Sequence, residues 1–201
     1  TTSSEELDGF IEELESYGQL CRHFNTPYIR VFGGAIGKTE REQAINIVVS
    51  NLEKLLPIAE KYDVTLLLET HDDWTKSEYV AEVYEKISSD HFKVLWDIHH
   101  PFRTLQEEPE HTMSTIGEFI RYTHWKDSYL TDQTDRGFQL CLLGEGNVPL
   151  EQIFRLLKNN QYDGYFTLEW EKKWWPNIEE PEVAFKHYAT FMKALEEKVS
   201  I

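Results

Sequence analysis

The feature that most constrains the fold is an alternation of short apolar runs with longer amphipathic segments. Five runs are rich in aliphatic and aromatic residues and short enough to be strands: YIRVF (28–32), VTLLLE (64–69), FKVLWD (92–97), RYTHWK (121–126) and GYFTLEW (164–170). Segments with helical spacing lie between or beside them, at 4–24, 39–62, 76–88, 112–119, 149–159 and 181–199. This alternation predicts an α/β fold with a parallel sheet or barrel.

Local signals refine two of these boundaries. Thr39 followed by Glu42 is a capping-box pattern and predicts that a helix begins at 39. Pro181 suits the first turn of the last helix. The segment 128–147 lacks a clear periodicity and is predicted to be a long polar loop.

The number of strands is the open question of the fold. We interpret residues 1–201 as a single domain. A (β/α)8 barrel needs eight strands in typically about 250 residues, and only five are found. Four explanations stay open. The chain is the C-terminal portion of a barrel, the sequence omits an N-terminal part, the strands form an open sheet, or another copy of the chain completes the barrel. An unpaired edge at 28–32 would favour association, so a homodimer is one expectation.

Composition excludes several classes of partner. The formal net charge is -16, with 36 Asp and Glu against 20 Lys and Arg, which opposes binding to nucleic acid or to an anionic membrane. No apolar stretch reaches the length of about 18 residues that suggests a membrane span, and no signal peptide is visible. Cys21 and Cys141 form no CxxC pair and are expected to be reduced and packed. We expect a cytoplasmic protein.

Four residues of the type that binds metal ions stand at the ends of four successive strand-like runs. They are Glu69, Asp97, His124 and Glu169. The carboxyl ends of parallel strands meet on one face of a βα fold, so these side chains are expected to converge. Three carboxylates and one imidazole suit one divalent cation, Mn²⁺, Mg²⁺, Co²⁺ or Zn²⁺. The sequence therefore predicts a metal-dependent enzyme.

Neighbouring residues supply candidates for binding a substrate. His100 follows Asp97 by three residues, a spacing that allows one side chain on a metal and the other on substrate or on a second metal. His71 follows Glu69 by two residues and would project from the same face of a strand. Arg136 is a candidate contact for a substrate phosphate, with a solvated surface charge as the alternative. Six tryptophans near the strand ends are either core residues or a stacking wall for a sugar.

The motifs LLLETH, LWDIHHP, HWKDS, LLGEGNVPL and GYFTLEWEKKWWP occur in this order between about residues 20 and 195. Together they resemble the sugar phosphate isomerase/epimerase family, whose members share a xylose-isomerase-like TIM barrel with endonuclease IV. The resemblance implies a TIM (β/α)8-type barrel that lacks its first three strands here, and therefore an N-terminally incomplete domain.

The resemblance also assigns roles by position. The family's metal ligands match Glu69, Asp97, His124 and Glu169, and its substrate-facing DxxH histidine matches His100. The lysine and aspartate of its HxKD motif match two further residues, of which the lysine is a candidate for substrate binding: Lys126 and Asp127.

The leading hypothesis is a divalent-metal-dependent isomerase or epimerase of a sugar or sugar phosphate, working by proton transfer through an enediolate. Glu69 and Glu169 would be the catalytic base and acid on either side of the substrate. His100, His71, and the basic side chains Arg136 and Lys126, would contact the substrate. The metal would act as a Lewis acid.

Three other hypotheses stay open. The same proton abstraction followed by loss of water would make a dehydratase of the inosose or dehydroshikimate type. A DNA-repair endonuclease like endonuclease IV is opposed by the net charge and by Gly137, which follows Asp135 and Arg136 where that enzyme type has a histidine. A barrel fragment that binds a ligand or a partner without catalysis is the third.

Overall fold

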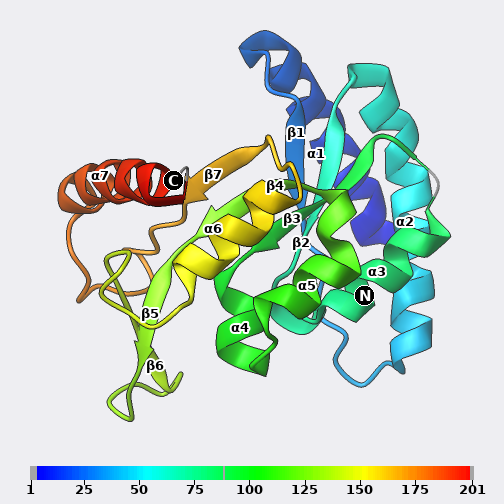
Figure 1. The fold of residues 1–201 in the computed structure, drawn as a ribbon. Coiled ribbons are helices and arrows are strands. Elements are labelled where there is room, and N and C mark those ends of the chain that lie inside the picture. The colour runs from blue at the N-terminus through cyan, green and yellow to red at the C-terminus, as the bar shows by residue number, and fades with distance from the viewer. Residues whose placement is uncertain (1–3, 88, 200–201) are drawn as a thin grey trace. The chain divides into compact units, whose positions relative to one another are not determined.

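The computed structural model of the chain describes residues 4–87 and 89–199, and it divides them into two compact units (Figure 1). The first unit comprises residues 4–96 together with Phe119–Arg121, and the second comprises Asp97–Glu118 together with residues 122–199. Each unit has its own strands and helices, and each is described by itself.

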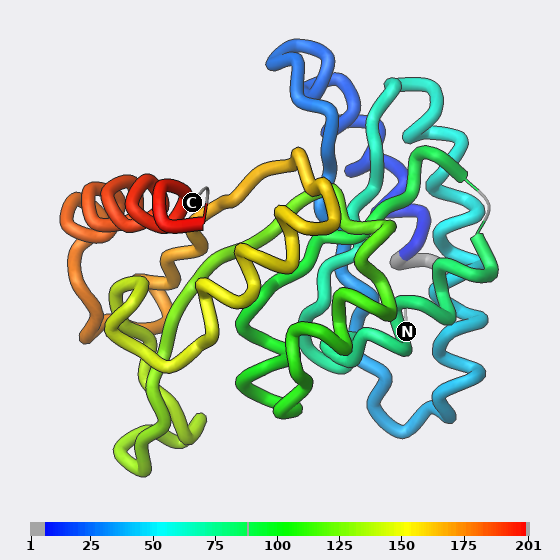
Figure 2. The backbone as a smooth tube through the Cα atoms, viewed as in Figure 1, coloured from blue at the N-terminus to red at the C-terminus, as the bar shows by residue number. Residues whose placement is uncertain are grey.

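The first unit alternates helices with parallel strands. Its elements are α1 (Ser4–Phe24), β1 (Tyr28–Val31), α2 (Arg41–Tyr62), β2 (Thr65–Glu69), the short 3-10 helix η1 (Asp72–Trp74), α3 (Ser77–Lys86) and most of β3 (Phe92–Asp97). Strand β2 pairs in parallel with β1 on one side and with β3 on the other. Helices α1 and α2 lie side by side, in blue and cyan in Figures 1 and 2.

Helix α2 shows how the sequence pattern builds the core of this unit. Its buried residues recur at helical spacing, from Ala44 and Ile45 through Val48, Leu52 and Leu56. This apolar stripe faces inward, and α2 contacts the buried strand β2. The apolar residues at helical spacing in α2 and the continuous apolar run of β2 therefore pack together in one hydrophobic core.

The second unit contains the remaining elements. They are α4 (His99–Leu105), α5 (Pro109–Ile116), the 3-10 helix η2 (Gly117–Phe119) at its border, most of β4 (Ile120–Trp125), β5 (Asp127–Leu130), β6 (Phe138–Cys141), α6 (Leu150–Asn159), β7 (Tyr165–Leu168) and α7 (Pro181–Val199). Strand β4 pairs in parallel with β7, with His124 opposite Thr167. Strands β5 and β6 form an antiparallel hairpin, which Figure 2 shows as a narrow loop in yellow-green.

The fold class predicted from sequence is confirmed. Strands β1, β2 and β3 are parallel neighbours in the first unit, β4 and β7 are a parallel pair in the second, and helices lie between successive strands along the chain. These are five of the eight strands that a complete (β/α)8 barrel requires. The expectation of a single domain over residues 1–201 stays a prediction.

Two expectations about local structure were wrong. Thr39 does not begin a helix: α2 begins at Arg41 after Glu40, whose side chain makes no cap hydrogen bond. The segment 128–147 is not all loop, because β5 and β6 pair within it and satisfy each other's backbone groups. Helix α4 was not expected. The short helix predicted near 112–119 is present as α5 followed by η2, and it begins at Pro109.

Other expectations hold or fall outside the described residues. The helix predicted at 76–88 is α3, which ends at Lys86, and residue 88 lies outside the part of the chain that the structure describes. Among the described residues, no helix has both the length and the apolarity needed to cross a bilayer. Cys21 and Cys141 are free and buried, as expected.

Cys141 should be unreactive in the folded protein. Burial raises the pKa of its thiol to about 12, and the carboxylates of Asp127, Glu145 and Glu179 add to the shift. Relative to an ordinary thiol with a pKa of 9.0, the thiolate at pH 8 is then about a thousandfold rarer. We expect alkylation by iodoacetamide at pH 8 to be slower by a similar factor in native protein than in concentrated urea.

This measurement is best made on a Cys21→Ser variant, so that all of the signal comes from Cys141. Equal rates in the native and unfolded states would contradict the burial of this thiol. The raised pKa of Cys141 also predicts how stability depends on pH. The contribution of this thiol to the free energy of unfolding is complete below about pH 9 and is lost as the pH rises toward about 12.

Candidate metal centre

Asp97 closes the buried strand β3 and lies at the start of the second unit. It is fully buried, and its Oδ1 accepts hydrogen bonds from the backbone N–H groups of His99 (2.8 Å) and His100 (3.0 Å). One oxygen of the carboxylate thus holds the first turn of α4. The other oxygen, Oδ2, lies 2.9 Å from the ammonium of Lys126 and 3.8 Å from Nε2 of His100.

The charge on Asp97 is set by these neighbours. Burial by itself would raise the pKa of the Asp97 carboxyl. The nearby Lys126, His100 and His99 outweigh burial and hold that pKa well below its usual range. Asp97 is therefore ionised at neutral pH, as a ligand for a cation must be.

His124 and Glu169 come from the paired strands β4 and β7. His124 lies on β4, and Glu169 directly follows β7, where its backbone N–H donates to the carbonyl of Trp125 at 3.0 Å. The parallel pairing therefore brings the two side chains together, with 3.6 Å between His124 Nδ1 and Glu169 Oε1. A ligand atom from each of Asp97, His124 and Glu169 lies within 4.8 Å of the others.

Lys126 is the unexpected centre of this group. It follows β4 directly, is 1% exposed, and its Nζ contacts Asp97, Glu169 and Glu171, with 2.8 Å to Glu171 Oε1. Its Nζ also lies 3.1 Å from His100 Nε2. Burial alone would lower the pKa of Lys126, but the three carboxylates raise it above its usual value, so the side chain stays charged.

The two glutamates beside Lys126 differ in charge state. Burial is the largest influence on Glu169 and raises the pKa of that carboxyl, with Lys126 opposing and Asp97 adding to the rise. For Glu171 burial also acts upward, but Lys126 prevails and the pKa is lowered. Glu169 is thus the carboxylate of this group that most readily takes up a proton.

Glu171 was missed by the sequence analysis, although a signal for it exists. It stands two residues after Glu169 in LEWE, and in extended chain residues two apart point to the same side. His99 was also missed. It is fully buried, its Nε2 lies 2.8 Å from Ser128 Oγ, and burial lowers its pKa to about 2, so it is neutral.

Glu69 and His71 lie in the first unit. Glu69 ends β2, is fully buried, and has its Oε2 3.4 Å from Nη1 of Arg30. His71 Nδ1 lies 3.0 Å from Asp72 Oδ2, and its ring meets that of Phe32 edge to face. Both residues are therefore where the sequence placed them, at and after the carboxyl end of β2.

Arg136 lies in the turn between β5 and β6. It is exposed, and its guanidinium carbon is 4.9 Å from the ring centre of Trp175. Trp175 packs against Phe138, whose ring in turn meets His99. The structure thus gives Arg136 an aromatic support, and its contact with a substrate phosphate stays a prediction.

Most of the tryptophans whose burial was in question are core residues, and one is exposed. Trp74, Trp96 and Trp125 are at most 1% exposed and belong to the core, whereas Trp174 is 63% exposed. Trp175 is buried in a cluster with neighbours from the hairpin and from the segment after β7. The cluster consists of Phe138, Leu140, Trp170, Trp175 and Ile178.

Asp127 organises the loop that follows the β5–β6 hairpin. Its carboxylate accepts hydrogen bonds from the backbone N–H groups of Gly144 (2.8 Å), Gly146 (3.0 Å) and Val148 (3.1 Å), as well as of Ser128. A side chain at Gly146 would collide with this carboxylate, since its Cβ would stand 2.2 Å from Asp127 Oδ1. The Asp127 carboxylate therefore supplies the hydrogen-bond acceptors that a neighbouring strand would supply in a sheet.

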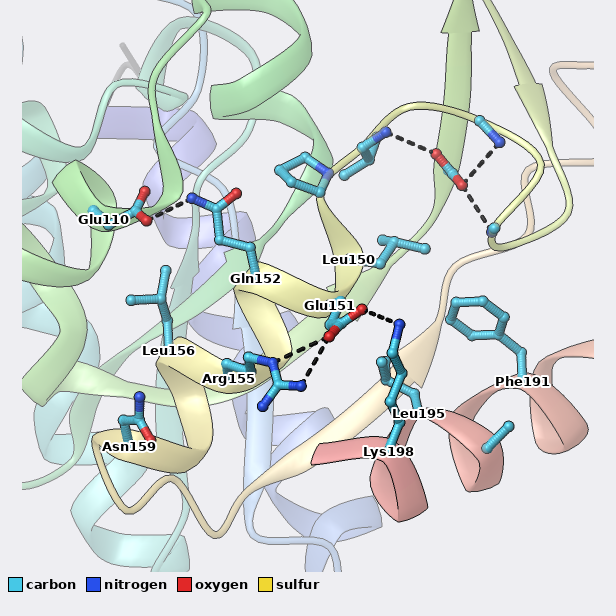
Figure 3. A pocket seen from close by; sticks show the side chains of 16 residues that line it. Glu110, Leu150, Glu151, Gln152, Arg155, Leu156, Asn159, Phe191, Leu195 and Lys198 are labelled. Atoms are coloured by element: carbon cyan, nitrogen blue, oxygen red, sulfur yellow. Dashed lines mark hydrogen bonds and ion pairs between the residues drawn. The ribbon is translucent and has the colours of Figure 1, made fainter. Parts of the chain in front are cut away.

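This loop forms one wall of a cavity of about 890 Å³ in the second unit (Figure 3). Figure 3 shows Gln152 directed to Glu110, and Arg155 and Lys198 directed to Glu151, so its charged groups are already paired. None of the predicted metal ligands lines it. The chemistry of the chain is therefore better judged from the group around Lys126 than from this cavity.

The family of the chain follows from its sequence. A model of the family described as xylose isomerase-like TIM barrel matches residues 1–195, and the chain belongs to this family. No curated protein matches the sequence.

Solved structures agree with this fold. The IOLI protein with a bound zinc atom has a TM-score of 0.82 and 19% identity, and a D-tagatose 3-epimerase-like protein has 0.80 and 19%; the match covers 99% of this chain and 73% of each. A xylose isomerase domain protein from Planctomyces limnophilus has 0.75 and 18%, over 94% of this chain and 65% of that one. At such identities the similarity is one of fold. This chain spans 65% to 73% of the length of these proteins.

Removal of the Asp127 carboxylate should loosen the 144–148 loop. Asp127→Ala leaves buried backbone N–H groups without an acceptor, which we expect to lower the free energy of unfolding by about 2–5 kcal/mol. Hydrogen exchange of the peptide 142–148 should become faster. Urea unfolding and exchange mass spectrometry measure the two effects.

Asp132→Ala is the matched control, because Asp132 is exposed in the same hairpin. It should change stability by no more than about 0.5 kcal/mol. Unchanged exchange in the 142–148 peptide of Asp127→Ala would show that the loop does not depend on this carboxylate.

Proposed function

We propose that this chain carries the metal site of a divalent-metal-dependent isomerase or epimerase that acts on a ketose-like sugar or its phosphate. The observation that carries the proposal is the group formed by the buried Asp97 and the partly buried His124 and Glu169 at the carboxyl ends of β3, β4 and β7. Glu69 stands at the equivalent end of β2, and we propose it as the fourth ligand.

The residues fit a divalent cation by their chemistry. Carboxylate oxygens with one imidazole are a donor set for Mn²⁺, Mg²⁺, Co²⁺ or Zn²⁺. Asp97 is held ionised, and it and His124 are oriented by backbone hydrogen bonds and strand pairing. The similar IOLI structure holds zinc, which supports the same kind of site here. When bound, such an ion polarises a substrate carbonyl and lowers the barrier to removing the adjacent proton.

The protein's own residues would move the proton. Glu69 is the proposed base that removes it from carbon. Glu169, whose pKa is raised by burial, is the proposed acid that returns a proton to the neighbouring carbon or to the opposite face of the same carbon. His100, His71 and Arg136 are proposed to hold substrate oxygens. The contacts of Lys126 with protein acceptors favour a positioning role for that residue.

A dehydratase is the second candidate. A probable 3-DHS dehydratase from Bacillus anthracis shares the fold at a TM-score of 0.65 and 19% identity, covering 84% of this chain and 65% of that one. The same proton removal would then be followed by departure of a hydroxyl group as water. Product analysis separates the two, because only a dehydratase changes the mass of the substrate. The homodimer and the exclusion of nucleic acid stay predictions.

Metal binding is the direct test of the site. Titration calorimetry of metal-stripped protein with Mn²⁺ should show one ion per chain. Asp97→Ala should weaken binding at least about a hundredfold, because it removes a ligand and leaves Lys126 with one partner fewer. Asp90→Ala is the control, since that side chain is fully exposed before β3, and it should bind as the native protein does.

Two results of this titration would count against the site. A folded native chain that binds no Mn²⁺ would remove the basis of the proposal and favour a non-catalytic role. Binding that survives Asp97→Ala undiminished would place the ion elsewhere.

Proton transfer at carbon is the test of the reaction. A panel of ketoses and ketose phosphates, incubated in D₂O with the Mn²⁺-loaded protein, should show deuterium at the carbon next to the carbonyl of an accepted substrate. Glu169→Gln should reduce turnover by about 10²–10⁴-fold, as expected for loss of a general acid–base group that is also a ligand. Glu182→Gln, on an exposed position of α7, should be unaffected.

Retention of full turnover by Glu169→Gln would show that the role is assigned to the wrong residue. Deuterium incorporation with no loss of water otherwise supports isomerisation or epimerisation, whereas a product that has lost one water supports the dehydratase.

A further inference from the structure

The buried ammonium of Lys126 has the surroundings of a metal ion. Its Nζ lies against Asp97 Oδ2 at 2.9 Å, Glu171 Oε1 at 2.8 Å, His100 Nε2 at 3.1 Å and an oxygen of Glu169. An ammonium has three protons, so four acceptors exceed what it can satisfy one by one. Carboxylates and an imidazole gathered around one positive charge are also what a divalent cation requires.

The four acceptors belong to two overlapping sets. Asp97 and Glu169 are proposed ligands of the metal ion, whereas His100 and Glu171 are not. Ligand atoms of His100, Glu169 and Glu171 nevertheless lie within 4.8 Å of one another and could hold an ion of their own. Glu169 is common to both sets: its Oε1 faces His124 at 3.6 Å and its Oε2 faces Lys126.

Lys126 cannot leave this position as a free ion could. Its backbone is held directly after β4, and its side chain is 1% exposed. Its charge balances one of the three carboxylates that it contacts, and so reduces the repulsion among three acidic groups that lie close together.

We propose that Lys126 sets the number of metal ions in the site. Its ammonium takes the place of a second divalent cation among His100, Glu169 and Glu171, so that the chain binds one ion and not two. This inference rests on the proposed metal site and deepens it. It also makes Lys126 a positioning residue, which holds Glu171 and His100 through their acceptor atoms.

The test is a count of ions in a variant without the charge. Metal-stripped Lys126→Met and Lys126→Gln are saturated with Mn²⁺, dialysed, and analysed for manganese per chain. We expect one ion in the native protein and two in both variants. Because Glu169 would bridge the two ions, the variants should also show the electron paramagnetic resonance signal of a coupled manganese pair, which the native protein should lack.

Three further variants identify the cause. Lys126→Arg keeps the positive charge and should bind one ion. The double variant Lys126→Met with Glu171→Gln loses a ligand of the second position and should return to one ion. Lys172→Met is the matched control: Lys172 Nζ is bound to the carbonyls of Pro176 (2.9 Å) and Ile178, and its removal should leave one ion.

Each outcome decides between the two proposals. One ion in the native protein and one in a folded Lys126→Met or Lys126→Gln overturns the inference and leaves the metal site standing. Two ions in the native protein also overturn it. If the native protein binds no ion, the proposed metal site is refuted. One ion bound by the Lys126 variants would then still support the cation role of Lys126. If the variants bind no ion either, both proposals are overturned.

Folding is followed by circular dichroism, with and without Mn²⁺. If Lys126→Met folds only when the ion is present, the count is made after refolding with Mn²⁺. Gln at this position keeps an amide that can donate to two of the acceptors, so Lys126→Gln serves where Lys126→Met does not fold.

Discussion

The second unit depends on one electrostatic arrangement, the burial of a lysine among three carboxylates. Asp97, Glu169 and Glu171 would each be costly to bury as an ion, and Lys126 supplies the charge that allows them to be close together. His100 Nε2 accepts a further hydrogen bond from the same ammonium. A buried polar network of this kind is stable only when the hydrogen-bonding groups of its members are satisfied together.

Backbone hydrogen bonds complete the positioning of this group. Asp97 uses one oxygen to hold the first turn of α4 and presents the other to the cation. Asp127, one residue after Lys126, accepts from backbone N–H groups of the 144–148 loop. Adjacent residues of the chain therefore have separate tasks: the lysine balances charge, and the aspartate orders a loop.

Family membership and site chemistry bear on different questions. The family model and the solved structures establish an α/β chain of the xylose isomerase-like TIM barrel kind. Folds of this type support many reactions, so the reaction must be argued from the residues themselves. The raised pKa of Glu169 and the lowered pKa of Asp97 are the basis on which we propose different tasks for these two carboxylates, proton exchange and cation binding.

Much of the fold was predictable because it depends on periodicity along the chain. Apolar runs separated by amphipathic segments identified all five parallel strands, and the residue that ends each run identified Glu69, Asp97, His124 and Glu169 as a set. Hairpin β5–β6 and helix α4 escaped prediction, because each is held by partners that have no local signature. In α4 that partner is a carboxylate two residues before the helix.

Sequence by itself therefore determined the fold class, the strand ends and the identity of the acidic and histidine residues there, because burial of apolar strands leaves a distinct pattern. Only the tertiary structure decided what surrounds Lys126. Its contacts with Glu171 and His100 join residues up to 45 positions apart, and no spacing in the chain reports such a distance. The charge states follow from those contacts, since burial and neighbouring charge set a pKa and neither can be read from residue type.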